Sequence, residues 1–122
     1  MTLQEAINYV DEVKPNAFST AVKVRWINQI EGRLVLEIFL MSTEEAAELE
    51  YGTSAAELAK KLLVDNPYDD VYTWWLQAQI DLANGEYDRA QNTMAMFNSA
   101  WSTFLRWFAQ RYDPVQGYGM EG

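Results

Sequence analysis

The chain has 122 residues, of which 18 are acidic and 9 basic, giving a net charge of −9, and it contains neither histidine nor cysteine. These absences exclude disulfides, thiolate nucleophiles, histidine-based catalytic triads and the usual zinc sites. The length is typical of one domain, the 49% hydrophobic content is typical of a globular protein, and the negative charge opposes nonspecific nucleic-acid binding.

The first segment predicts a helix over Leu3–Val13. Thr2 and Glu5 have the spacing of a capping box, and Pro15 disfavours helix in the residue before it. Three apolar residues share one face of this helix: Leu3, Ile7 and Val10. The start is amphipathic and acidic, which is not the pattern of a signal peptide, so none is expected there. No apolar run is long enough to span a membrane, so no membrane partner is expected.

A second, longer helix is predicted over Thr20–Met41, with Ser19 as its cap. Gly32 interrupts it at a cost of about 1 kcal/mol relative to alanine. The apolar, β-branched run within Arg33–Leu40 is also compatible with a short strand, but the length and the fourfold spacing favour a helix. The residues that carry this spacing are Val22, Trp26, Ile30, Leu34 and Ile38.

The segment Ser42–Asn66 is the least patterned part of the chain. Five glutamates lie close together without a cation among them, which indicates a solvated surface: Glu44, Glu45, Glu48, Glu50 and Glu57. Ser54 and Glu57 form another capping-box pattern. A short helix is therefore predicted over Ala55–Leu63, and Pro67 ends this segment.

The C-terminal half predicts a helical hairpin. Asp69 or Asp70 caps a helix over Asp70–Ala83, and Asn84-Gly85 ends it, because glycine accepts the left-handed conformation. The inner face of this helix is predicted to hold Val71, Trp75, Ala78 and Leu82. A last helix is predicted over Glu86–Arg111, antiparallel to the first because the turn is short. Its apolar stripe is Ala90, Met94, Phe97, Trp101, Phe104, Phe108 and Tyr112.

The predicted fold is all-α, a small helical bundle of four main helices with a long C-terminal antiparallel hairpin. Residues 1–112 form one domain. Asp113-Pro114 ends the ordered part, and the glycine-rich residues 113–122 are predicted to be a flexible C-terminal tail.

Acidic side chains are the only abundant reactive groups. Asp81, Glu86 and Asp88 flank the Asn84-Gly85 turn, where a divalent cation is one interpretation, but their spacing matches no calcium loop. Capping or solvating the turn is therefore the favoured role of these three residues. Asp69 and Asp70 are a conceivable catalytic pair, but adjacent side chains at a helix start point apart, so capping is favoured there as well. We therefore predict no enzyme and no catalytic, cofactor-binding or metal-binding residues, and expect no cofactor.

The tryptophans and tyrosines divide into two groups. Core packing is expected for those on the inward stripes: Trp26, Trp75, Phe97 and Trp101. Trp74, Trp107, Tyr72 and Tyr87 lie off those stripes, and exposed aromatics of this kind are enriched in interfaces. A wide buried face in a small bundle is the other interpretation.

Tyr87-Asp-Arg-Ala90 after Asn84-Gly85 resembles the turn of a tetratricopeptide hairpin, with Trp75 and Leu82 upstream. About three such repeats are needed to bury their faces against one another, and a second copy is not seen in the sequence. A tetratricopeptide-like helical protein-binding or regulatory module, a monomer or dimer with an open apolar groove, is therefore the alternative hypothesis for function.

A set of segments carries a wider resemblance: Asp11–Asn16, Arg25–Asn28, Glu31-Gly32, Asn66–Tyr72, Ala78–Arg89, Asn92–Asn98, Trp101 and Arg106-Trp107. Together they are similar to head–tail connector (adaptor, head-completion) proteins of tailed phages and prophages of Gram-positive bacteria. The likeness covers residues 1–112 and is densest over residues 66–107. Two features depart from the family pattern, which has an aromatic residue near Ala90 and a shorter segment at Ser42–Ala59.

The resemblance implies a structural protein of the virion, present in the bacterial host cytoplasm during assembly. Its partners would be further copies of itself in a homo-oligomeric ring, the portal protein, and tail or stopper proteins, with DNA passing through the ring without specific binding. Ring contacts need two complementary faces. We expect one face at Pro67, Tyr68, Asp69, Tyr72 and Trp74, and the other at Arg106, Trp107 and Arg111.

Overall fold

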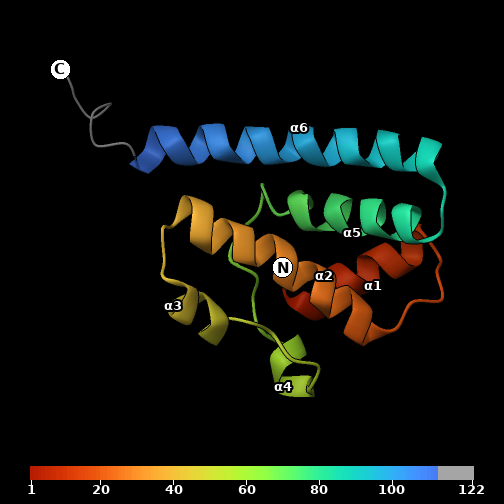
Figure 1. The fold of residues 1–122 in the computed structure, drawn as a ribbon, viewed down its shortest axis with the longest axis horizontal. Helices are drawn as coiled ribbons and strands as arrows, with labels where there is room; N and C mark the ends of the chain where they lie inside the picture. Colours follow the sequence, from red (N-terminus) through yellow and green to blue (C-terminus); the bar gives the residue numbers. More distant parts are fainter. Residues whose placement is uncertain (113–122) are drawn as a thin grey trace.

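The computed structural model describes residues 1–112, which form a helical bundle (Figure 1). The helices are α1 (Leu3–Val13), α2 (Thr20–Arg33), α3 (Thr43–Glu48), α4 (Ala55–Leu58), α5 (Asp70–Ala83) and α6 (Tyr87–Tyr112). Residues Leu34–Ile38 continue α2 as a π-helical turn. The predicted all-α fold, with four main helices and a long C-terminal hairpin, is confirmed. The predicted tail, residues 113–122, lies outside the described residues.

The layers follow the amphipathic faces of the helices. In Figure 1, α6 lies along one side with α5 beneath it, α1 and α2 pack below α5, and α3 and α4 lie on the opposite side. Burying apolar side chains between these layers is the main source of stability. The largest fully buried ones come from α1, α2 and α5 and include Leu3, Ile7, Ile27, Leu76 and Ile80, and α6 adds Phe97 and Phe104, each 3% exposed.

Helix α1 begins and packs as its sequence predicts. Thr2 accepts a hydrogen bond from the Glu5 backbone N–H at 3.1 Å, and Glu5 accepts one from the Thr2 N–H at 2.7 Å, which completes the capping box. At the first residue of the helix, the Leu3 N–H donates to the Lys60 carbonyl at 3.0 Å. The start of the chain is thereby tied to the segment that follows α4.

The prediction of one helix over Thr20–Met41 is wrong at its C-terminal end. The α-helix stops at Arg33, and the π-helical turn that follows ends at Ile38. Leu40 then adopts a left-handed backbone with φ of 57°, and its side chain is 80% exposed. The wider turn keeps Leu34 and Val35 buried while the chain turns toward α3.

The acidic segment contains more helix than the sequence analysis predicts at one place and less at another. Helix α3 was not predicted, although Ser42 and Glu45 form a complete capping box at its start. Helix α4 ends at Leu58 instead of Leu63. Neither short helix has a fully buried residue, which agrees with a surface segment.

The α5–α6 hairpin is confirmed. Asn84 ends α5, Gly85 has φ of 73°, and its N–H donates to the Leu82 carbonyl at 3.0 Å. Two details differ from the prediction. Leu82 is 41% exposed instead of buried, and the Asp69 side chain makes no capping hydrogen bond to α5.

An ion pair ties the hairpin to α1. Asp81 is 1% exposed and accepts hydrogen bonds from Lys14 Nζ at 2.8 Å and 2.7 Å, one to each carboxylate oxygen. The Thr93 hydroxyl of α6 donates to the same carboxylate at 3.0 Å. A buried carboxylate needs such partners, because desolvation penalises an unpaired charge.

Among the described helices, none has a stretch both long and apolar enough to cross a lipid bilayer.

Candidate functional site

A buried carboxylate connects three separate parts of the chain. Glu31 of α2 is 5% exposed. Its Oε1 accepts a hydrogen bond from the Tyr72 hydroxyl of α5 at 2.6 Å, and its Oε2 accepts hydrogen bonds from the Tyr51 hydroxyl and the Leu63 N–H, both at 2.9 Å. The Tyr72 oxygen in turn accepts from the Val64 N–H at 2.8 Å. We call Glu31, Tyr51 and Tyr72 the carboxylate cluster.

Burial decides the protonation of this cluster. It raises the pKa of Glu31 above 4.5, against the opposing effect of the hydrogen bonds from Tyr72, Leu63 and Tyr51. The pKa values of Tyr51 and Tyr72 are also raised, first by burial and then by the neighbouring Glu31 charge. Both tyrosines therefore keep their protons at neutral pH and serve as hydrogen-bond donors to Glu31.

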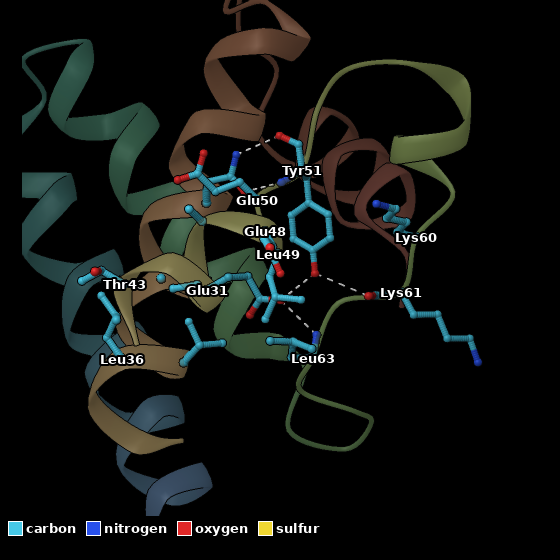
Figure 2. A pocket seen from close by; sticks show the side chains of 15 residues that line it. Glu31, Leu36, Thr43, Glu48, Leu49, Glu50, Tyr51, Lys60, Lys61 and Leu63 are labelled. Carbon is cyan, nitrogen blue, oxygen red and sulfur yellow. Dashed lines mark hydrogen bonds between the residues drawn. The ribbon is translucent and has the colours of Figure 1, made fainter. Parts of the chain in front are cut away.

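A cavity of about 430 Å³ opens beside the carboxylate cluster, between α2, α3 and the segment before residue 63 (Figure 2). Its apolar lining includes Val35, Leu36 and Leu63, and Gly32 leaves open space where a side chain would project. In Figure 2 the Lys61 side chain runs away from the cavity. The cavity thus has an apolar wall and a polar edge whose carboxylate is already hydrogen-bonded.

A second group of aromatic residues lies where α6 extends past the start of α5. The rings of Tyr68 and Trp107 stack with centroids 4.9 Å apart, and Phe104 contacts both. The Arg111 guanidinium lies 5.8 Å from the Trp107 ring centroid, within cation–π range. A cavity of about 280 Å³ adjoins these rings and is lined in addition by Pro67 and Phe108.

The structure brings together residues that were predicted to lie on two different faces of the ring subunit. Tyr68 was assigned to one face and Trp107 to the other, yet they are in contact, so together with Pro67 and Arg111 they form one surface. Tyr72 is 1% exposed, and its prediction as an interface residue is wrong, because its hydroxyl is bound to Glu31 in the core.

The remaining candidates are more dispersed. Trp74 and Asp69 are half-buried, and Trp74 packs against the core. Arg106 is exposed and donates to the Thr103 hydroxyl at 3.4 Å. Five positions separate Arg106 from Arg111, which places them roughly 140° apart around α6. The two arginines therefore do not belong to one face.

Two of the three acidic residues at the hairpin turn, Asp81 and Glu86, form ion pairs. Asp81 binds Lys14 in the interior, and Glu86 lies 3.1 Å from Arg89 on the surface. Across residues 1–112, side chains of the metal-ligating type do not come together in a group of three or more.

The carboxylate cluster was missed by the sequence analysis. A usable signal existed, because Glu31 falls between Ile27, Ile30 and Leu34 on the buried face of α2, and a carboxylate at such a position needs buried donors. The sequence has no comparable sign for Tyr51, which reaches Glu31 from a segment without regular structure.

Comparison of the chain with family models, with curated proteins and with solved structures gave no significant match in any of the three.

Proposed function

We propose that the chain is a structural subunit of a phage or prophage head–tail connector, an adaptor that forms a ring between the portal and the tail. One observation carries this proposal. The residues with the densest resemblance to connector proteins, 66–107, span α5 and most of α6, and they include the stacked rings of Tyr68 and Trp107.

The chemistry of the chain supports an assembly role. With no histidine or cysteine in the sequence, and with Glu31 and Asp81 bound to neighbouring side chains in the interior, the residues suited to new contacts are aromatic and cationic. In this proposal the protein acts in the host cytoplasm during assembly and in the virion afterwards. Its net negative charge lets DNA pass through the ring without adhering.

The tetratricopeptide-like alternative has less support. Its hairpin would be α5–α6, whose helices have 14 and 26 residues, whereas such repeats stack helix pairs of similar length. The other consecutive pair of long helices, α1 and α2, packs mainly against α5 and less against each other. The apolar cavity beside α3 lies outside the hairpin.

Co-purification with a portal protein tests the proposal. The chain would be expressed with the portal protein encoded in the same genome, and the product studied by size-exclusion chromatography with light scattering and by negative-stain microscopy. We expect a ring of this protein bound to the portal. A genome without portal and capsid genes beside this one, or a chain that does not bind that portal, would contradict the proposal.

A further inference from the structure

The exposed face of α6 differs in charge from the rest of the molecule. The chain has 18 acidic residues, but between Arg89 and Tyr112 it has three arginines and no aspartate or glutamate. Helix α6 has 26 residues, a length of about 39 Å. Most of this length is therefore free of negative charge in a protein whose net charge is −9.

The outward-facing residues of α6 carry little charge. The side chains opposite the buried stripe are all exposed: Gln91, Ala95, Ser99, Ser102, Arg106 and Ala109. The outer face of a solvated helix normally carries many charged residues, and serine is a weaker helix former than glutamate or lysine. Interface cores are depleted of lysine and acidic residues and enriched in arginine, and Arg106 is the one charged residue of this face. Its serines and alanines are not in themselves marks of an interface. We call these six residues the outer α6 face.

The opposite side of the molecule has the complementary charge. Glu44 and Glu48 of α3 are both exposed, and neither lies within ion-pair distance of a cation in residues 1–112. They are four positions apart on one short helix, where like charges repel. Glu50 adds a third exposed carboxylate just beyond α3. A cation from outside the protomer would relieve this repulsion.

The positions of the two surfaces suit a repeating contact. In Figure 1, α6 and α3 lie on opposite sides of the molecule with α2 and α5 between them. Two different complementary patches on opposite sides give a heterologous contact, which closes into a ring or continues as a filament.

We infer that the outer α6 face of one copy packs against the α3 glutamates of the next copy, with Arg106 beside Glu44 and Glu48. This inference rests on the proposed function and names the contact between ring subunits. Of the three arginines of α6, Arg106 is the one assigned to this contact. Arg89 is already 3.1 Å from Glu86, and Arg111 lies against the Trp107 ring.

Self-association of charge-reversed variants tests this contact. Sedimentation velocity would be measured up to about 1 mM protein, which detects association as weak as a Kd of about 1 mM. The buffer would contain about 10 mM salt, at which the interaction between charges extends over roughly 30 Å. We expect Arg106→Glu to weaken association about tenfold, Glu44→Lys with Glu48→Lys to do the same, and the three changes together to restore it.

Two controls reverse equal numbers of exposed charges elsewhere: Arg25→Glu on α2, and Glu12→Lys on α1 combined with Asp65→Lys before α5. They should leave association unchanged. A wild-type monomer at the highest concentration, equal effects of the controls, or no restoration by the combined change would overturn the inference. So would Arg106→Glu abolishing binding to a DNA duplex while association is unaffected, since that makes nucleic acid the occupant of the outer α6 face.

The connector function and the α6–α3 contact can each be contradicted without contradicting the other. A chain that joins the portal in a ring insensitive to all these changes contradicts the α6–α3 contact and leaves the connector function standing. Association that follows the charge pattern in a chain that does not bind the portal supports the contact and contradicts the connector function.

Discussion

The Tyr72 hydroxyl donates to Glu31 Oε1 at 2.6 Å, across 41 positions of sequence. This bond joins α5 to α2, and the other two donors to Glu31 bring in Tyr51 and Leu63 from the segment between them. One carboxylate thus fixes the position of a segment that has little regular structure of its own.

Removing the Tyr72 hydroxyl should therefore destabilise the fold. Tyr72→Phe leaves Glu31 with one donor fewer and the Val64 N–H without its acceptor, a loss of about 1–3 kcal/mol in the free energy of unfolding. Urea denaturation followed by circular dichroism measures it. Tyr87→Phe is the control, because Tyr87 is 67% exposed. Equal stabilities of the two variants would show that the buried bond contributes nothing.

The stability of the fold should depend on pH through Glu31. Its pKa is raised above 4.5 by burial, so its contribution to stability is complete below the unfolded-state pKa and is lost as pH rises through the folded-state pKa. Glu31→Gln does not titrate at this position. The unfolding free energy of the wild type minus that of the variant should therefore fall as pH rises.

Denaturation in urea at intervals from about pH 4 to about pH 8 measures this difference. Subtracting the variant removes the contributions of Glu5, Glu45 and Glu57, whose pKa values are lowered by hydrogen bonds. Those residues act in the opposite direction. A difference that grows with pH would mean that the hydrogen bonds to Glu31 outweigh its burial.

Removing the lysine of the Lys14–Asp81 pair while keeping the aspartate should lower the free energy of unfolding strongly. Lys14→Met leaves the Asp81 carboxylate in the interior with only the Thr93 hydroxyl among its side-chain donors, a loss of about 3–5 kcal/mol. Adding Asp81→Asn removes the unpaired charge and should recover part of that loss, which thermal denaturation can measure. Glu37→Ala breaks the exposed pair with Arg33 and should change stability by at most about 1 kcal/mol.

Two glycines should respond to alanine with opposite signs. Gly32 lies inside α2, and an added Cβ meets no atom within 4 Å, so Gly32→Ala should stabilise the protein by about 0.5–1 kcal/mol. Gly85 also has open space, but its φ is 73°, and alanine there should destabilise by roughly 1–2 kcal/mol. Chemical denaturation of both variants checks the pair. A destabilised Gly32→Ala would show that α2 has less room at Gly32 than the structure shows.

Local signals explain which parts of the fold the sequence predicts well. The capping box at Thr2 and Glu5 and the glycine at position 85 act within a few residues of themselves, and both helix ends are where these residues place them. The π-helical turn after Arg33 has no such local cause, because it depends on how Leu34 and Val35 are packed. Helix α3 had its own capping box at Ser42, which the surrounding glutamates obscured.

Predictions about surfaces are harder, because they depend on which distant segments meet. Tyr68 and Trp107 were placed on opposite faces, but α6 is long enough to extend past α5 and bring Trp107 onto Tyr68. Tyr72 lies off the predicted stripe of α5, but it shares a buried face with Leu76 and Ile80 at steps of four. There its hydroxyl donates to Glu31 and accepts from the Val64 N–H.

The short turn at Gly85 also bears on how the protein folds. The contacts between α5 and α6 join residues that are near one another along the chain, so the entropy lost in closing that loop is small. The Lys14–Asp81 ion pair instead spans 67 positions. We therefore expect the hairpin to be formed already in the folding transition state and the N-terminal helices to dock onto it afterwards. Kinetic φ-values, the share of a mutation's stability change that is felt in the transition state, should be near one in α5 and near zero at Lys14.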